Sequence, residues 1–257
     1  MLRLHDTSSG RAERVVPEGA RALRIGTRGP AARPARLGDL RPHLLADLVR
    51  RVCERHRLRV VLHRAADDDA FHADTLTLNL RPAEHSSPGA LPEVPEGTVL
   101  LDAAGGPAGP RAVRTGPVLG GDASAAGGAG ATLGDVAARG LDPLAVRLAL
   151  LGHRYREPAD LSWDALRAAD RTLRRMRSRV AEWSEHPSSP MPVDRVARIE
   201  AALDDDLDTP SALRLAEELE QDEALAPGSR FEAFVHLDTV LALDLPADIG
   251  RPPGEPR

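Results

Sequence analysis

The chain has 257 residues, a formal net charge of −5 and 42% hydrophobic residues, which is enough for one large or two modest globular domains. Only 2% of the residues are aromatic, so the core has to be built from Leu, Val and Ala. No apolar run approaches the roughly 18 residues of a membrane span, and the N-terminus lacks the apolar core of a signal peptide, so a cytoplasmic protein is expected. Cys53 is the only cysteine, which excludes internal disulfides and multi-cysteine metal sites.

All 34 basic residues are arginine, so no mechanism that needs a catalytic lysine is open to this chain. The charge is also unevenly distributed. Residues 1–64 hold 15 Arg against 6 acidic residues, a net of +9, and residues 193–257 hold 6 Arg against 16, a net of −10. This asymmetry has two interpretations, a basic surface for phosphates or two parts of the chain that attract one another.

The first quarter of the chain alternates extended and helical patterns. Residues 1–16 are typical of an entry strand and turn, and residues 22–27 of a first central strand. A loop rich in Gly, Pro and Arg follows, then a helix over 40–57 with Leu and Val on one face, and a strand over 58–63. Strand, loop, helix and strand form the βαβ unit of an α/β nucleotide-binding fold.

The middle of the chain is less regular. Alternating apolar and polar residues predict strands over 74–80, 98–101 and 111–119. Residues 105–131 are rich in Gly and Ala. The predicted organisation is a reduced Rossmann-like domain over 1–121, a linker over 122–131 and a helical bundle domain over 132–257.

Capping residues mark the helices of the second half. Gly140 can end the first of them with a positive φ, and Pro143 and Pro210 suit first helical positions. The predicted N-caps are Thr132, Asp142, Ser162 and either Asp208 or Thr209. Further helices are predicted over 163–183, 193–203, 211–225 and 231–245. The fold class is therefore α/β followed by an all-helical bundle.

Two stretches of this half are similar to markers of a known family. The first contains Thr132-Leu-Gly-Asp, Asp142-Pro143 followed by Arg147, and Tyr155-Arg156. The second is Leu203-Asp-Asp-Asp-Leu-Asp-Thr-Pro. Together they resemble the class I aminoacyl-tRNA synthetase family, namely cysteinyl-tRNA synthetases and the related mycothiol cysteine ligases. The resemblance implies a Rossmann-like nucleotide fold and a truncated, degenerate member of that family.

The resemblance also locates the family's ATP and zinc positions. A zinc-binding cysteine corresponds to Arg28, and the glycine and proline after it are retained. The His-Ile-Gly-His signature, whose histidines contact ATP phosphates, corresponds to Arg36-Leu-Gly-Asp39. Arg36 can still hold phosphate, whereas Asp39 is expected to cap a helix that starts at Leu40. If nucleotide binding is retained, the expected contacts are Gly29, Pro30, Arg36, Gly38 and Asp39.

Two further family elements are reduced. The acidic element corresponds to Ala65–Asp69, where a solvated turn fits better than a magnesium site, because consecutive carboxylates do not easily reach one ion. The lysine-rich ATP loop corresponds to residues 122–126, which keep one serine. No zinc or other metal site is expected, and ATP is the one cofactor left open.

The predicted helix over 163–183 carries many arginines on its polar side. Arg167, Arg171 and Arg174 are the candidate tRNA contacts, because the matching region of the family lies near tRNA. The alternative is an ordinary solvated arginine face.

These changes favour a protein that no longer forms an aminoacyl adenylate and acts by binding tRNA, a nucleotide or another protein. Each lost transition-state donor typically costs about 2.7–4 kcal/mol. The alternative is an ATP-dependent aminoacyl ligase in which arginines, among them Arg28, Arg33 and Arg36, replace the missing groups.

Overall fold

The structure is a computed structural model. It describes residues 1–7, 9–16, 19–30, 34–65, 69–87, 98–102, 112–119 and 130–251. Within this part of the chain, none of the helices is both long and apolar enough to cross a membrane.

A five-stranded parallel sheet is the centre of the first half. Its strands run in the order β5-β4-β3-β6-β7, which in order of appearance is 3-2-1-4-5, the doubly wound arrangement of a Rossmann fold. The strands are β3 (Ala22–Arg28), β4 (Arg59–Ala65), β5 (His85–Ser86), β6 (Val99–Asp102) and β7 (Ala112–Arg114). Helix α1 (Leu37–Arg55) connects β3 to β4. The predicted α/β fold is confirmed.

The core of this half forms between the sheet and α1. Leu23 and Ile25 of β3 are register partners of Val60 and Leu62 of β4, and all four side chains are buried. Parallel sheets need such apolar strands because helices cover their faces. Cys53 of α1 is also buried, which raises the pKa of its thiol to about 12.

The strand predicted over 74–80 is wrong, because this region belongs largely to helix α2 (Asp69–Thr77). The alternation of Thr and Leu suggested a strand, yet only Phe71 and Thr75 of the helix are buried, four residues apart as on one helical face. Leu76 is 49% exposed, so the alternation does not reflect burial.

The strand predicted over 111–119 is divided. Its first part is β7, and its second part, β8 (Val118–Leu119), leaves the sheet and pairs with β9 (Ala159–Asp160). Between them, Gly116 lies so close to the 156–157 backbone that a Cβ on it would be 2.2 Å from the Glu157 carbonyl oxygen. The chain can therefore make this crossing only with glycine.

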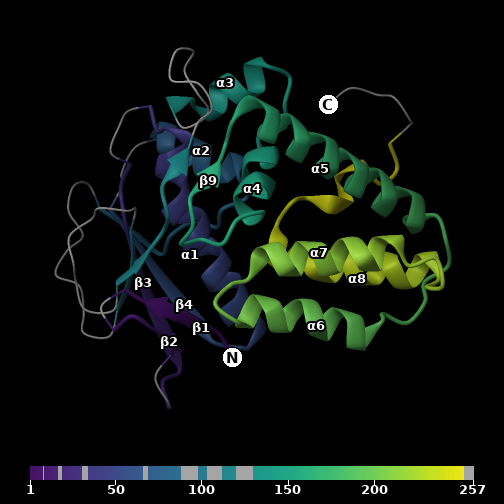
Figure 1. Ribbon diagram of the computed structural model, residues 1–257, viewed down its shortest axis with the longest axis horizontal. Coiled ribbons are helices and arrows are strands. Elements are labelled where there is room, and N and C mark those ends of the chain that lie inside the picture. Colours follow the sequence, from purple (N-terminus) through teal and green to yellow (C-terminus); the bar gives the residue numbers. More distant parts are fainter. Residues whose placement is uncertain are drawn as a thin grey trace.

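The second half is helical throughout its described part, apart from β9. Its helices are α3 (Leu133–Ala138), α4 (Leu144–Leu151), α5 (Trp163–Ser184), α6 (Val193–Asp204), α7 (Thr209–Gln221) and α8 (Pro227–Leu241). Figure 1 shows the sheet on one side of the molecule, α5 to α8 on the other, and α1 between them. The helix predicted over 231–245 begins and ends four residues earlier, and Ala242 terminates it with a φ of 53°.

The predicted caps account for most of the helix starts. Thr132 Oγ1 accepts from the Asp135 N–H at 3.2 Å, Ser162 Oγ from the Ala165 N–H at 3.3 Å, and Asp208 Oδ1 from the Ser211 N–H at 3.2 Å. Asp142 accepts from Leu144 N–H at 2.9 Å, so α4 begins one residue after Pro143. Local sequence sufficed here because a cap involves only neighbouring residues.

The N-terminal hairpin joins the two halves. Strands β1 (Arg3–Asp6) and β2 (Arg11–Arg14) pair antiparallel, as the entry strand and turn predicted. The Thr7 N–H donates to the Ala112 carbonyl of β7 at 3.0 Å, and the Asp206 N–H donates to the Arg3 carbonyl at 3.1 Å. The linker predicted over 122–131 lies outside the described residues except for its last two, and the domain boundaries stay a prediction.

Candidate functional site

The strand order reverses between β3 and β6. After β3, the chain first adds β4 and β5 on one side of it, and then adds β6 and β7 on its other side. The switch point of the sheet is therefore at the carboxyl ends of β3 and β6. Ligands of doubly wound folds bind at this point. Here two charged residues meet across it. Arg28 ends β3 and Asp102 ends β6, and Arg28 Nε lies 2.8 Å from Asp102 Oδ2.

Sequence analysis identified Arg28 but missed Asp102. The signal was present, since an acid directly follows the apolar strand 98–101, but pairing required knowing that β6 lies beside β3. The pair is partly exposed and stabilises the fold by at most about 1 kcal/mol. Gly29 and Pro30 follow β3 as half-buried residues, whereas Arg33 lies outside the described residues.

The N-terminus of α1, where the family signature would hold phosphate, is bound by the chain itself. The Leu37 N–H donates to the Ala131 carbonyl at 2.9 Å, and the Arg36 N–H donates to Asp39 Oδ2 at 3.0 Å. A helix N-terminus binds anions through such N–H groups. Two of the N–H groups at this end are therefore already engaged.

Asp39 was expected to cap a helix beginning at Leu40, and that position is wrong. The helix begins at Leu37, so Asp39 is its third residue and its carboxylate reaches back to the Arg36 N–H. The apolar Leu37, fully buried, extends the helix by a turn. Gly38 is not required sterically, because a Cβ there would meet Val118 at an ordinary 3.6 Å.

Arg36 and Gly38 thus come together with β8 and Ala131, and Asp39 lies on the same helical turn. The Arg36 side chain is exposed, and its Nη1 lies 3.8 Å from the place a Cβ on Gly130 would occupy. The predicted nucleotide contacts around α1 are therefore adjacent, although Arg28 is engaged with Asp102. Whether this group binds a nucleotide stays a prediction.

One turn further along α1, Arg41 is almost completely buried and fastens the neighbouring loops. Its guanidinium donates to four carbonyls, those of Gly116 at 2.7 Å, Glu157 at 2.8 Å, Arg154 at 3.0 Å and Pro117 at 3.2 Å. Burial lowers the pKa of Arg41 to about 10, while the charge of Glu157 acts in the opposite direction. Arg41 remains charged at neutral pH, and its guanidinium hydrogen-bonds backbone carbonyls. Sequence analysis did not identify it.

The two marker stretches bind each other. Tyr155 donates its hydroxyl to Asp206 Oδ1 at 2.6 Å, Arg156 Nη2 lies 2.7 Å from Asp206 Oδ2, and Arg154 pairs with Asp208. Burial and the Asp206 carboxylate raise the pKa of Tyr155. The markers that carried the resemblance therefore hold the 154–156 loop to the α6–α7 junction.

The marker arginine of α4 joins the two halves from inside. Arg147 is fully buried and donates to Asp47 Oδ2 of α1 at 2.8 Å, and also to the carbonyls of Leu241 and Leu78 at 2.6 and 3.1 Å. Arg51 Nε also lies 2.7 Å from Asp47 Oδ2. The described contacts of Arg147 are thus with the chain itself.

The candidate tRNA contacts lie along the exposed side of α5. Arg167 pairs with Asp164 and Arg174 with Asp170, each at 2.7 Å, and Arg171 is exposed. Other arginines meet the acidic C-terminal part instead: Arg175 pairs with Glu217 and Glu220 of α7, and Arg55 with Glu200 and Asp204 of α6. Part of the charge asymmetry is thus internal pairing, and the three candidate arginines of α5 remain on a surface.

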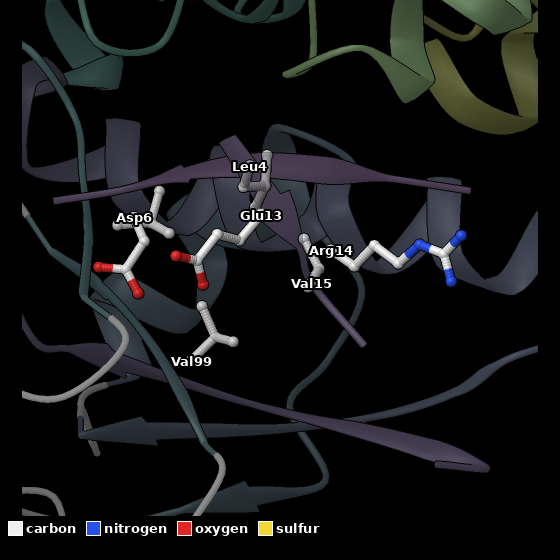
Figure 2. A pocket seen from close by; sticks show the side chains of 7 residues that line it. Leu4, Asp6, Glu13, Arg14, Val15 and Val99 are labelled. Carbon is white, nitrogen blue, oxygen red and sulfur yellow. The ribbon is translucent and has the colours of Figure 1, made fainter. Parts of the chain in front are cut away.

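Two hollows in the described residues differ greatly in size. Figure 2 shows a hollow lined by Asp6 and Glu13 of the hairpin, in which the Glu13 carboxylate points toward Val99. Its volume is about 20 Å³, which holds one water. A larger hollow of about 290 Å³ lies between α5 and α7, over Leu148, Met176 and Leu213.

We expect zinc analysis of the protein, purified without chelators, to give far less than one equivalent. Arg28 occupies the family's cysteine position and pairs with Asp102, and the buried Cys53 thiol stays protonated at neutral pH. Thiolate, not thiol, binds zinc. Inductively coupled plasma mass spectrometry decides this, and stoichiometric zinc after dialysis contradicts it.

Comparison with known proteins places these features in a family context. No protein-family model matches the chain. It is 36% identical over 109 residues to the L-cysteine:1D-myo-inositol 2-amino-2-deoxy-alpha-D-glucopyranoside ligase of Renibacterium salmoninarum, which is 41% of this chain and 24% of the relative. The ligase of the same name from Thermobifida fusca is 40% identical over 79 residues, 31% of this chain and 18% of the relative.

The Cysteine--tRNA ligase of Novosphingobium aromaticivorans is 34% identical over 113 residues, 42% of this chain and 23% of the relative. The aligned part of the chain thus spans about a fifth to a quarter of the length of these relatives. The chain is a partial homologue of these two kinds of class I synthetase, and the resemblance predicted from the marker stretches is confirmed.

Proposed function

We propose that this chain is a cysteinyl-tRNA synthetase-like protein that has lost amino-acid activation and acts by binding. One observation carries the proposal: the chain's own groups occupy the carboxyl edge of the sheet, where this fold activates its substrate. Asp102 pairs with Arg28 at the switch point, and the Ala131 carbonyl takes the first N–H of α1. The absence of lysine removes the loop cations as well.

Electrostatics supports the same conclusion. The family's signature places donors where the phosphate gathers negative charge, and this chain places the Asp39 carboxylate on that turn. A carboxylate about 4 Å from a phosphate charge costs about 4 kcal/mol at an effective dielectric constant near 20. Such an arrangement disfavours ATP in the orientation needed for adenylation.

The test is ATP–pyrophosphate exchange with each amino acid, cysteine included, and the ligase of Thermobifida fusca as positive control. We expect no exchange above a no-enzyme control. Loss of two or more oxyanion donors, at about 2.7–4 kcal/mol each, lowers the rate by at least about four orders of magnitude. Exchange with any one amino acid would contradict the proposal.

The alternative, an ATP-dependent ligase that uses arginines, is favoured by one observation. Arg36 is exposed at the start of α1, with no ion pair to any described residue, so its guanidinium is free to take a phosphate. If exchange were observed, Arg36→Gln should reduce it strongly and Arg24→Gln, an exposed arginine of β3, should not. Equal activity of the two variants would exclude Arg36 as the phosphate ligand.

For a binding protein of this scaffold we propose tRNA as the partner, held by the exposed arginines of α5. Changing Arg167, Arg171 and Arg174 together to Gln should weaken tRNA binding and reduce the slope of log affinity against log salt by about 2–3, since each contact releases counterions. The melting temperature should change little, because the ion pairs of Arg167 and Arg174 are exposed and lie within α5, and the one contact outside the helix is an exposed hydrogen bond from Arg174 to the Gly140 carbonyl.

A matched control changes the exposed Arg195, Arg198 and Arg214 of α6 and α7 to Gln, for the same loss of charge. Filter binding at several salt concentrations and a thermal melt measure both effects. Unmodified protein that fails to retain tRNA at low salt contradicts the partner, and so does an equal loss in the control.

A further inference from the structure

Beyond the proposed function, the sheet contains a cluster of buried polar side chains that the contacts described so far do not use. Thr27 of β3 and Arg64 of β4 are register partners, each one residue before the end of its strand, so both side chains project from the same face. Thr27 is 0% exposed and Arg64 4% exposed. His43 of α1, 1% exposed, lies over this part of the sheet.

The ring of Phe71 contacts two members of the cluster, His43 and Arg64. The Phe71 ring of α2 meets the His43 ring edge-on, with centroids 4.7 Å apart, and Arg64 Cζ lies 5.9 Å from the Phe71 centroid. This cation–π contact orients the guanidinium but accepts none of its N–H groups. Arg64, His43 and Phe71 therefore form one cluster at the carboxyl edge, with Thr27 beside Arg64 on the neighbouring strand, next to the Arg28–Asp102 pair along β3.

Three polar atoms of the cluster have no hydrogen-bond partner in the structure: Thr27 Oγ1, His43 Nδ1 and Arg64 Nε. Among the described residues no carboxylate forms an ion pair with Arg64. Asp47, whose charge acts on it, already accepts from Arg51, Arg147 and the Arg81 N–H. An unpaired guanidinium in the interior is costly, so native proteins bind such a group to an acceptor, an ordered water or an ion.

The cluster combines hydrogen-bond donors on Arg64 with an acceptor on His43, and this combination restricts the kind of ligand that can bind. Arg64 offers donors in a fork that matches two oxygens of an oxyanion. His43 is neutral at physiological pH, since burial and the nearby Arg64 charge lower its pKa to about 3. Its ring also hydrogen-bonds the Arg28 backbone, and Nδ1 is then left as an acceptor. A matching ligand carries acceptor oxygens together with an O–H donor.

We propose that Thr27, His43 and Arg64 form a binding site for a protonated phosphate group, either inorganic phosphate or the end of a phosphomonoester. Two phosphate oxygens accept from Arg64, the P–OH donates to His43 Nδ1, and the Thr27 hydroxyl donates to a third oxygen. Acetate and sulfate carry no O–H at neutral pH and leave His43 Nδ1 without a partner.

The experiment is a thermal melt of the full chain in phosphate, glycerol phosphate, acetate or sulfate, each compared with sodium chloride at the same ionic strength. At roughly 100 times the dissociation constant, phosphate should raise the melting temperature by about 5–10 °C. Acetate and sulfate should produce a smaller rise. A rise with glycerol phosphate as well assigns the site to phosphomonoesters, and a rise with inorganic phosphate alone assigns it to the free ion.

Two variants localise the effect. Arg64→Met should abolish the phosphate-specific rise, whereas Arg59→Met, an exposed arginine of the same strand with the same loss of charge, should keep it. Isothermal titration calorimetry with inorganic phosphate provides a direct readout. The proposal is overturned if the wild-type chain shows no rise beyond chloride, if sulfate or acetate raises the melting temperature as much as phosphate does, or if Arg64→Met retains the phosphate-specific rise. The wild-type comparison decides even if a variant fails to fold.

Discussion

Replacing Asp47 with Asn should lower the free energy of unfolding by about 3–5 kcal/mol, because it leaves a buried guanidinium without its counterion. Arg147 is 0% exposed and Asp47 2% exposed, and Arg147 Nη2 lies 2.8 Å from Asp47 Oδ2. Asn matches the carboxylate in shape, so the loss reports charge and not packing. For a chain of this size the melting temperature should fall by about 6–20 °C.

The matched control is Glu218→Gln, which removes a carboxylate from an exposed pair with Arg214 on α7. Exposed pairs contribute about 0–1 kcal/mol, so its melting temperature should stay within a few degrees. Chemical denaturation followed by circular dichroism measures both variants. Equal, small effects would contradict a central role for the Asp47–Arg147 pair.

The pH dependence of stability provides an independent check. Burial opposes the charge of Asp47, yet Arg147 and Arg51 together hold the pKa of its carboxyl below the ordinary value. A depressed pKa stabilises the folded state above the unfolded-state pKa of about 3.9, and this contribution is lost as the pH falls below it. The wild-type chain should therefore lose stability on acidification more steeply than Asp47→Asn.

Local signals made the helices predictable. Thr132, Ser162 and Asp208 each cap a helix through a residue three positions away, and a stripe such as Leu166, Leu173 and Val180 on α5 is fully buried. A cap is encoded within one helical turn, and an apolar stripe within one face of a helix, so both can be recognised from the local sequence. The helix taken for a strand, α2, is short and has few buried residues, so neither period dominates its sequence.

The candidate site was only partly predictable because its decisive contacts are long-range. Arg28 and Asp102 are 74 residues apart and meet only because β6 pairs with β3. The Leu37 N–H is bound by a main-chain carbonyl, that of Ala131, which no side-chain pattern encodes. The family resemblance identified which residues of this chain correspond to the family's signature, but it did not predict their contacts. Those contacts became known only from the structure.

Long-range contacts give the marker arginines a role in the fold. Arg147, Arg154 and Arg156 all connect segments that are at least 50 residues apart. Their partners are carbonyls or carboxylates of the chain itself, so these contacts form in the folded chain without a ligand. The homologous region therefore supports a conclusion about fold more firmly than one about chemistry.

The second large effect is expected at Arg41, whose removal takes a hydrogen bond from four carbonyls. Pro117 and Arg154 keep a backbone donor, the N–H of Ala159 and of Glu157, whereas the Gly116 and Glu157 carbonyls lose their described donor. Arg41→Met keeps most of the side-chain volume, so the cost is that of the lost hydrogen bonds and of burying unpaired oxygens. The free energy of unfolding should fall by about 3–5 kcal/mol. Arg41→Lys retains the charge but cannot reach all four carbonyls from one ammonium, so it should also destabilise the chain.

The region that is destabilised in Arg41→Met distinguishes the loss of these hydrogen bonds from a general loss of packing. Two of the four carbonyls, those of Gly116 and Pro117, directly precede β8, and β8 lies beside Gly38 at the start of α1. The Ala159 N–H donates to Pro117 at 2.9 Å and the Leu161 N–H to Leu119 at 2.9 Å. In Arg41→Met these two amides should exchange with solvent markedly faster, while amides at the centre of α5 should change only as far as global stability does. Hydrogen exchange followed by mass spectrometry resolves the two regions, and uniform acceleration throughout the chain would show that Arg41 does not hold β8 in place.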